Sequence, residues 1–195
     1  MDIYELLIKK LGLKDPELIN SINEMVEIKK FKKNELIIAE GEVQTHFYCL
    51  LSGVFRGFLF DKNGKEITDC FGFELGDAVM SCHALGDKAK TNIEAITEVI
   101  TAKISVEDLQ MLLERFPEMF WLYNDLLLKA LDEHWNIKEV RYRLSAAERY
   151  QWFLETYPEL VKYVKGKHIA SFLGMSPVSL SRLRHDLKNG SNELK

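Results

Sequence analysis

Hydrophobic positions follow three different periods along the chain, and each predicts a different kind of element. Apolar residues recur at helical spacing in 3–11 and again in 16–22, which predicts two short helices. Between about 31 and 104, short apolar runs are broken by glycine, asparagine and aspartate, a texture typical of a compact all-β domain. Asn63-Gly64 lies between two such runs and predicts a hairpin with a type I′ turn, in which both central residues have positive φ.

A long helix is predicted from Pro117 to about Tyr142. Apolar residues at alternating spacings of three and four form a stripe along it, which favours a partner helix. Because the opposite side is apolar too, this helix can pack both on its own domain and on a second copy in a parallel homodimer. The predicted dimer interface consists of Phe120, Tyr123, Leu127, Ala130, His134 and Ile137. Ser145 and Glu148 then predict a capping box that opens the next helix.

The stretch 166–185 has the residue pattern of a helix-turn-helix. Ala170 is small where two helices would cross, and Gly174 supplies the left-handed residue that ends the first helix. Ser176 can cap the second helix, and Pro177 fits its first position, which needs no amide hydrogen. Short polar groups followed by cations on the outer face are suited to base edges and phosphates. The predicted DNA-binding residues are Lys167, His168, Ser176, Pro177, Val178, Ser179, Ser181, Arg182 and His185.

Net charge also distinguishes the C-terminal part of the chain from the rest. The net charge of −4 is the sum of −9 in residues 1–140 and +5 in residues 141–195. A basic C-terminal part on an acidic body favours nucleic acid as the partner of that part.

Other classes of protein lack support in the sequence. No apolar run approaches the roughly 20 residues that cross a bilayer, and the start is not a signal peptide, so we expect a cytoplasmic protein without membrane contact. Cys49, Cys70 and Cys82 lack metal-ligand spacing and are expected to be buried free thiols. No cofactor or metal is therefore predicted. Nucleophile, phosphate-loop and dinucleotide motifs are missing, which argues against an enzyme.

The order of these parts resembles the Crp/Fnr family of transcription regulators. The resemblance rests on Gly41-Glu42, 50–54, 63–67 and Gly76-Asp77, followed by 145–150, 157–160 and 168–174. The last three resemble a subgroup found most often in Bacteroidetes and some Firmicutes. An α+β fold is implied: an N-terminal β-roll of the cyclic-nucleotide-binding type (a double-stranded β-helix), a long dimerisation helix, and a C-terminal helix-turn-helix domain. The implied boundaries are 1–116, 117–142 and 143–195.

The resemblance also implies a function. It implies a homodimer that binds a palindromic operator in double-stranded DNA through the recognition helix, 177–187, and that contacts RNA polymerase if it activates. Members that respond to cyclic AMP place arginine and glutamate near the start of this helix, where this chain has Pro177 and Val178, so we expect a different operator. The alternative is an effector-binding or scaffold protein with weak or lost DNA binding.

The sensor part departs from the pattern of a cyclic-nucleotide site. Ser81 stands where the family's glutamate is expected, and no arginine occurs between Arg56 and Arg115 to pair with the phosphate. Lys90 offers only a point charge. This favours a small effector other than cyclic AMP, or none, with haem through His83 or His134 as a further alternative. The predicted effector pocket consists of Val79, Met80, Ser81, Cys82, Lys90, Thr91, Tyr123 and Leu127.

Overall fold

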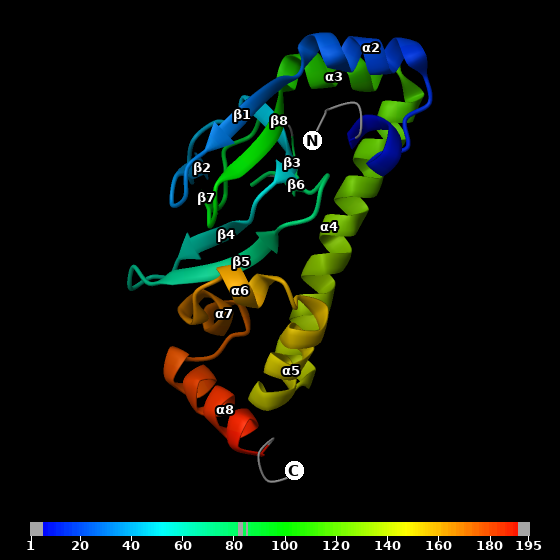
Figure 1. Ribbon diagram of the computed structural model, residues 1–195. Coiled ribbons are helices and arrows are strands. Elements are labelled where there is room, and N and C mark those ends of the chain that lie inside the picture. The colour runs from blue at the N-terminus through cyan, green and yellow to red at the C-terminus, as the bar shows by residue number, and fades with distance from the viewer. Residues whose placement is uncertain (1–5, 82–83, 85, 191–195) are drawn as a thin grey trace. The chain divides into compact units, whose positions relative to one another are not determined.

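The computed structural model describes residues 6–81, 84 and 86–190. They form two compact units (Figure 1). Unit 1 comprises the described residues of 1–59 and 70–130, and unit 2 comprises those of 60–69 and 131–195. The predicted limits after residues 116 and 142 follow helix ends, whereas the two units divide one long helix between Ala130 and Leu131. The three-domain division stays a prediction.

Helices of unit 1 begin where the sequence offers a cap. A short π-helical segment, η1 (Leu6–Lys10), precedes α2 (Pro16–Met25), and the Asp15 side chain accepts hydrogen bonds from the Glu17 and Leu18 amides at the start of α2. Ser105 caps α3 (Val106–Arg115) in the same way, through the amide of Asp108. The long α4 (Pro117–Arg143) follows directly. The predicted helix opened by Pro16 is confirmed.

Two antiparallel four-stranded sheets make up the β-domain. One has the order β1-β8-β3-β6 and the other β2-β7-β4-β5, so strands far apart in sequence become neighbours. Their bounds are β1 (Glu27–Phe31), β2 (Leu36–Ile38), β3 (His46–Ser52), β4 (Phe55–Phe60), β5 (Glu66–Gly72), β6 (Ala78–Val79), β7 (Asn92–Ala95) and β8 (Val99–Ser105). The predicted α+β fold with an N-terminal β-domain is confirmed.

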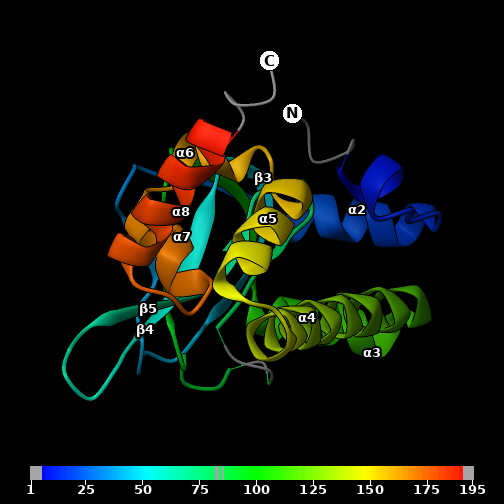
Figure 2. The same cartoon turned by 90° about the horizontal axis from the view of Figure 1, so that it is seen from below.

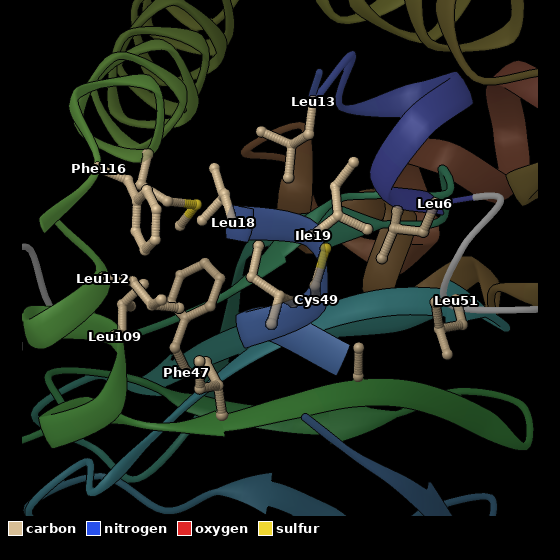
Figure 3. Packing of buried hydrophobic residues seen from close by; sticks show 14 residues of the cluster. Leu6, Leu13, Leu18, Ile19, Phe47, Cys49, Leu51, Leu109, Leu112 and Phe116 are labelled. Atoms are coloured by element: carbon tan, nitrogen blue, oxygen red, sulfur yellow. The ribbon is translucent and has the colours of Figure 1, made fainter. Parts of the chain in front are cut away.

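Each face of the first sheet packs on a separate apolar cluster. Phe31, Leu50 and Val99 of this sheet join Phe55 and Ile93 of the other sheet in the interior of the β-domain. The opposite face meets the helices, where residues of β3 and β8 pack against α2, α3 and the first turns of α4. Figure 3 shows this second cluster, with Phe47 and Cys49 of β3 below Leu18 and Ile19 of α2. We call it the helix-side cluster.

The β4–β5 hairpin corrects one detail of the sequence prediction. Its turn is not type I′, because Gly64 has a φ of 77° whereas Asn63 does not have positive φ. The Asp61 carboxylate accepts hydrogen bonds from the amides of Asn63 and Lys65, and the Gly64 amide donates to the Asp61 carbonyl. An aspartate at the first turn position thus stabilises an ordinary turn followed by a left-handed glycine.

Besides the hairpin tip and the last part of α4, the described residues of unit 2 form α5 (Ala146–Thr156), α6 (Leu160–Tyr163), α7 (Gly166–Phe172) and α8 (Pro177–Gly190). The predicted capping box is present, since Ser145 and Glu148 exchange side chain-to-amide hydrogen bonds at the start of α5. Phe153 of α5 and Phe172 of α7 meet edge to face with ring centroids 6.0 Å apart. Figure 2 shows α7 and α8 packed together.

Candidate nucleic-acid interface

The turn between α7 and α8 has the geometry that the sequence predicts. Gly174 lies in the left-handed region with a φ of 65°, a conformation that costs glycine little. The Ser176 hydroxyl accepts a hydrogen bond from the Ser179 amide at 3.0 Å and so caps α8, and Pro177 is the first residue of that helix. The predicted glycine turn, cap and helix start are confirmed at these three positions, and the helix-turn-helix itself stays a prediction.

Apolar residues on the inner face fix the two helices to each other. Ile169, Ala170 and Leu173 are completely buried, and Leu180 of α8 is 2% exposed. Arg184 adds a polar contact: its Nε donates to the Tyr150 hydroxyl at 3.0 Å, and its guanidinium carbon lies 5.5 Å from the centre of that ring. The sequence analysis missed this role. Arg184 orients α8 on α5 rather than facing solvent.

The outer face of α8 is open to solvent. Ser176, Pro177, Val178, Ser179, Ser181, Arg182 and His185 are all exposed, as is Lys167 on α7. His168 is a correction, because its side chain lies inside unit 2 and only 5% of the residue is exposed. A buried imidazole cannot reach a phosphate, so His168 leaves the set of candidate DNA contacts, whose other members are all exposed.

The predicted dimer stripe on α4 is displaced by one residue from the exposed apolar stripe. Ile137 is 7% exposed and Tyr123 packs edge to face on Phe47 at 6.3 Å, so these two face the interior of their own units. Leu127 and Ala130 are half-buried, whereas Phe120 and His134 are exposed. The correction removes Ile137 and Tyr123 from any surface that a second copy would cover.

A different set of apolar residues on α4 is exposed. Trp121, Leu128, Trp135 and Tyr142 recur at every seventh position with exposed fractions of 63, 51, 53 and 79%, and Leu131 between them is 53% exposed. We call these five residues the heptad stripe. Its signal is present in the sequence, but a parallel stripe starting at Phe120 has the same period. Periodicity alone cannot decide which of the two is covered by the β-domain.

The predicted effector residues do not converge on one pocket. Val79 is fully buried between the two sheets, whereas Met80 packs on the helix-side cluster. The Ser81 hydroxyl bonds to the Thr91 amide at 2.7 Å and to the Thr91 carbonyl at 2.6 Å. Lys90 is exposed and Leu127 half-buried, while Cys82 and His83 lie outside the described residues. Of the seven described residues of this set, Tyr123 alone lines the apolar cavity of unit 1.

Cysteine thiols and acidic groups offer no metal centre in the described part of the chain, since no three His, Cys, Asp or Glu side chains gather there. Neither Cys49 nor Cys70 forms a disulfide; Cys49 is buried as expected and Cys70 is half-buried, whereas Cys82 lies outside the described residues. Among these described residues no helix is long and apolar enough to cross a membrane.

Comparison with known protein families gives a match within the β-domain. Residues 28–116 match the family model of the cyclic nucleotide-binding domain. The match begins in β1 and ends at Phe116, which directly precedes α4, so it includes both sheets and α3. No curated protein matches the chain.

Solved structures share the fold of the whole chain. FixK2 from Bradyrhizobium japonicum has a TM-score of 0.77 and 17% identity over 85% of this chain and 86% of its own. The c-di-GMP responsive global regulator CLP from Xanthomonas campestris has a TM-score of 0.75 and 17% identity, with 91% and 93% covered. A protein from Eubacterium rectale described as a Crp/Fnr-family transcriptional regulator has a TM-score of 0.72 and 17% identity, with 91% and 85% covered. The chain therefore shares the fold of these three proteins.

An arginine inside the matched segment 28–116 already has an acidic partner. The Arg56 side chain is 2% exposed, and one of its terminal nitrogens lies 3.1 Å from a carboxylate oxygen of Glu94, which faces it across β4 and β7. The guanidinium also lies over the Phe58 ring at 4.2 Å. A buried guanidinium is stabilised by this pairing, and binding an anionic ligand instead would leave Glu94 without its cation.

Proposed function

We propose that the protein is a homodimeric, sequence-specific DNA-binding transcription regulator of the Crp/Fnr type. The observation that carries this proposal is the geometry of α7 and α8: a left-handed glycine turn, a capped second helix, and an outer face on which seven predicted contact residues are exposed together. A helix presented in this way fits the major groove, with the residues near its N-terminus closest to the base edges.

Side-chain chemistry on α8 divides the proposed contacts into two kinds. Arg182 has a planar fork of donors that matches the two acceptors of guanine in the major groove. Ser179 and Ser181 are short and can donate to a base or to a phosphate. Lys167, on α7, suits the phosphate backbone, where contacts position the protein without reading sequence. We therefore assign base recognition chiefly to Arg182 and backbone positioning to Lys167.

The heptad stripe on α4 supports a second copy of the same chain as the partner of this helix. A seven-residue apolar repeat is the pattern that lets two helices wind around each other, because 3.5 residues per turn keep the same side chains at the seam. Two tryptophans and two leucines more than half exposed along one helix are otherwise unfavourable in water. A parallel pair of α4 helices would also present two copies of α8 to the two halves of a palindromic site.

The effector we propose is not cyclic AMP. The position of the family's ribose-binding glutamate is occupied by Ser81, whose hydroxyl already bonds to Thr91, and the buried Arg56 is paired with Glu94. The second candidate function, an effector-binding or scaffold protein with weak DNA binding, is favoured by the acidic balance of residues 1–140 alone. Contact with RNA polymerase stays a prediction.

DNA selection tests this function. The purified protein is incubated with fragments of its own genome, and the retained fragments are sequenced to define an operator, whose affinity is then measured at several salt concentrations. We expect a palindromic site and an affinity that falls steeply with salt, because bound phosphates release counterions. Retention of fragments without a shared sequence, or no retention, would support the scaffold alternative.

Two matched substitutions separate base reading from backbone contact. Arg182→Ala should weaken operator binding by about 1–3 kcal/mol and relax the base preference at one position in each half-site. Lys167→Ala should weaken operator and random DNA about equally and reduce the salt slope by about one. Operator affinity unchanged by Arg182→Ala would remove that residue from the recognition set.

Charge introduced into the heptad stripe tests the homodimer. Leu128→Glu and Trp135→Glu should give monomers in sedimentation, because each would bury two carboxylates at the seam of a parallel pair. Asn136→Glu is the control, since Asn136 is the exposed neighbour of Trp135 on the same helix and lies outside the stripe. A dimer that survives both stripe substitutions would contradict this interface.

A further inference from the structure

Unit 1 contains a cavity of about 70 Å³ within the helix-side cluster. Three groups of side chains form its walls. The N-terminal segment and α2 contribute Leu6, Leu13 and Ile22, the sheet contributes β3 and β8, and α3 and α4 contribute the remaining side, including Leu122 and Leu126. This is the opposite face of the sheet from the interior of the β-domain, and of the described residues of the predicted effector pocket, Tyr123 alone lines the cavity.

The cavity exists because two small residues face each other on the sheet. Cys49 of β3 and Ala102 of β8 are direct partners across the two strands, and both line the cavity. The neighbouring pair Phe47 and Ile104 is large and also lines it. Two small side chains at one register position therefore leave space that larger ones would fill. Burial, with a smaller contribution from Asp77, raises the pKa of the Cys49 thiol to about 12, so this wall carries no charge at neutral pH.

We propose that this cavity is a binding site for a small apolar molecule, comparable in size to a xenon atom or a short hydrocarbon. Among the described residues, no side chain that lines it has a formal charge, so a nucleotide or another anion would lose its hydration without gaining a partner there. Its volume is about half that of an engineered 150 Å³ cavity that stays dry and binds benzene or xenon. Apolar lining and small volume together define the chemical class of the ligand.

Occupation of the cavity would act on the long helix. Met119, Leu122, Tyr123 and Leu126 lie on the inner face of α4 at positions i, i+3, i+4 and i+7, and all four line the cavity. On the same turns, Trp121 and Leu128 of the heptad stripe are exposed. One turn further, the Lys129 ammonium group lies 3.0 Å from an Asp77 carboxylate oxygen and holds α4 to the loop before β6. A ligand that pushes on the inner face therefore shifts residues of the proposed dimer seam.

The binding step is tested with xenon as the probe. The full-length protein, with isotope-labelled methyl groups, is equilibrated with xenon under pressure and followed by NMR. We expect shifts at methyl groups of Ala102, Ile104 and Leu126, and none at Ile93, which is buried in the other cluster of unit 1. Unshifted signals at all three lining residues, or shifts of equal size at Ile93, would overturn the proposal.

A substitution that fills the cavity provides the matched control for the xenon experiment. Ala102→Leu places three further carbon atoms into the space and should abolish the xenon-induced shifts. Because Ala102→Leu can also strain the sheet, Cys49→Val is made in parallel, and the secondary structure and thermal unfolding of both are recorded. Loss of xenon shifts in at least one variant that folds as the wild type does supports the site. Wild-type shifts in every folded variant would overturn it.

The effector role rests on the proposed function and has its own measurement. A series of butane, cyclopentane and benzene is tested for its effect on operator affinity of the wild type and of the folded filling variant. We expect at least one member to change the wild-type affinity threefold or more and to leave the variant unchanged. Xenon binding without any effect on operator affinity would overturn the effector role alone, and failure of DNA binding itself would appear before any ligand is added.

Discussion

Unit 1 and unit 2 are stabilised by different means. The interior of unit 1 consists of two apolar clusters on the two faces of one sheet, and its cavity shows that these clusters leave space. Unit 2 has a smaller apolar core that is supplemented by arginine side chains bonded to main-chain carbonyls and to a tyrosine. Apolar contacts are non-directional, whereas hydrogen bonds require one geometry. The interior of unit 1 can therefore accommodate changes in packing volume, whereas the hydrogen bonds of unit 2 fix the arrangement of its helices.

Arg141 shows how the polar contacts of unit 2 work. Two of its nitrogens donate to the Phe172 carbonyl at the end of α7, at 2.9 and 2.6 Å, and one also donates to the Thr68 carbonyl in the hairpin tip at 3.5 Å. The Ser171 hydroxyl completes the junction by accepting from the Thr68 amide at 3.0 Å. The first helix of the helix-turn-helix is thereby held to α4 and to the hairpin.

The largest expected losses of stability come from truncating one large buried side chain in the core of each unit. Leu112→Ala in unit 1 should lower the free energy of unfolding by about 2–5 kcal/mol, and Phe153→Ala in unit 2 by about 3–5 kcal/mol, because both side chains are at most 1% exposed. Amide hydrogen exchange separates the units. We expect Phe153→Ala to accelerate exchange in α5, α7 and α8 while β3 and β8 keep their protection. Equal loss throughout the chain would mean that the two units unfold together.

A smaller loss of stability is expected when Arg141, which bonds to main-chain carbonyls in unit 2, is replaced. Arg141→Met keeps much of the apolar stem but leaves the Phe172 carbonyl without its donor, which should cost about 1–3 kcal/mol. Arg143→Met is the control, because Arg143 is exposed and its 3.5 Å ion pair with Glu139 contributes about 1 kcal/mol or less. Urea unfolding of both variants provides the comparison. Equal costs would show that the junction is not the source of stability in unit 2.

A smaller loss still is expected at the cap of α8. Ser176→Ala removes the hydroxyl that accepts from the Ser179 amide and should cost about 1 kcal/mol. Ser181→Ala, on the exposed face of the same helix, should change the stability by about 0.5 kcal/mol or less. Thermal unfolding followed by circular dichroism measures both. An effect of Ser181→Ala as large as that of Ser176→Ala would contradict the capping role.

The smallest effect is a pH dependence confined to unit 2. Hydrogen bonds from the hydroxyl and amide of Ser145 lower the pKa of the Glu148 carboxyl. A lowered pKa in the folded state means that this contribution is present above the carboxyl's ordinary pKa and is lost as the pH falls through the lowered value. The difference in unfolding midpoint between wild type and Glu148→Gln should therefore shrink on acidification. A difference independent of pH would exclude this carboxylate as the titrating group.

Local signals predicted the second unit well. The Ser145 capping box, the Gly174 turn and the Ser176–Pro177 start of α8 each depend on residues within four positions of one another, so the sequence contains all of the relevant chemistry. The type I′ turn predicted from Asn63-Gly64 was wrong, and the reason is also local. The Asp61 side chain, two positions before Asn63, bonds to the turn and determines its type.

Long-range contacts account for the other differences. His168 and Ile137 are buried by residues that lie close in space, and the sequence around each of them does not predict this burial. Val79 and Met80 are adjacent in sequence, yet Val79, the last residue of β6, packs between the sheets and Met80, directly after it, packs on the helix-side cluster. The pairing of Cys49 with Ala102 depends on the register of β3 against β8, which are about fifty residues apart.

The sequence by itself determined the order of the elements, the caps of α5 and α8, the α+β class and the position of the turn between α7 and α8, because period and local hydrogen bonding act over a few residues. Only the tertiary structure decided which of two equal stripes on α4 is exposed, which arginines pair with backbone, and where the apolar cavity lies. These depend on which surfaces meet across the fold. Packing selects among faces that the sequence pattern leaves equivalent.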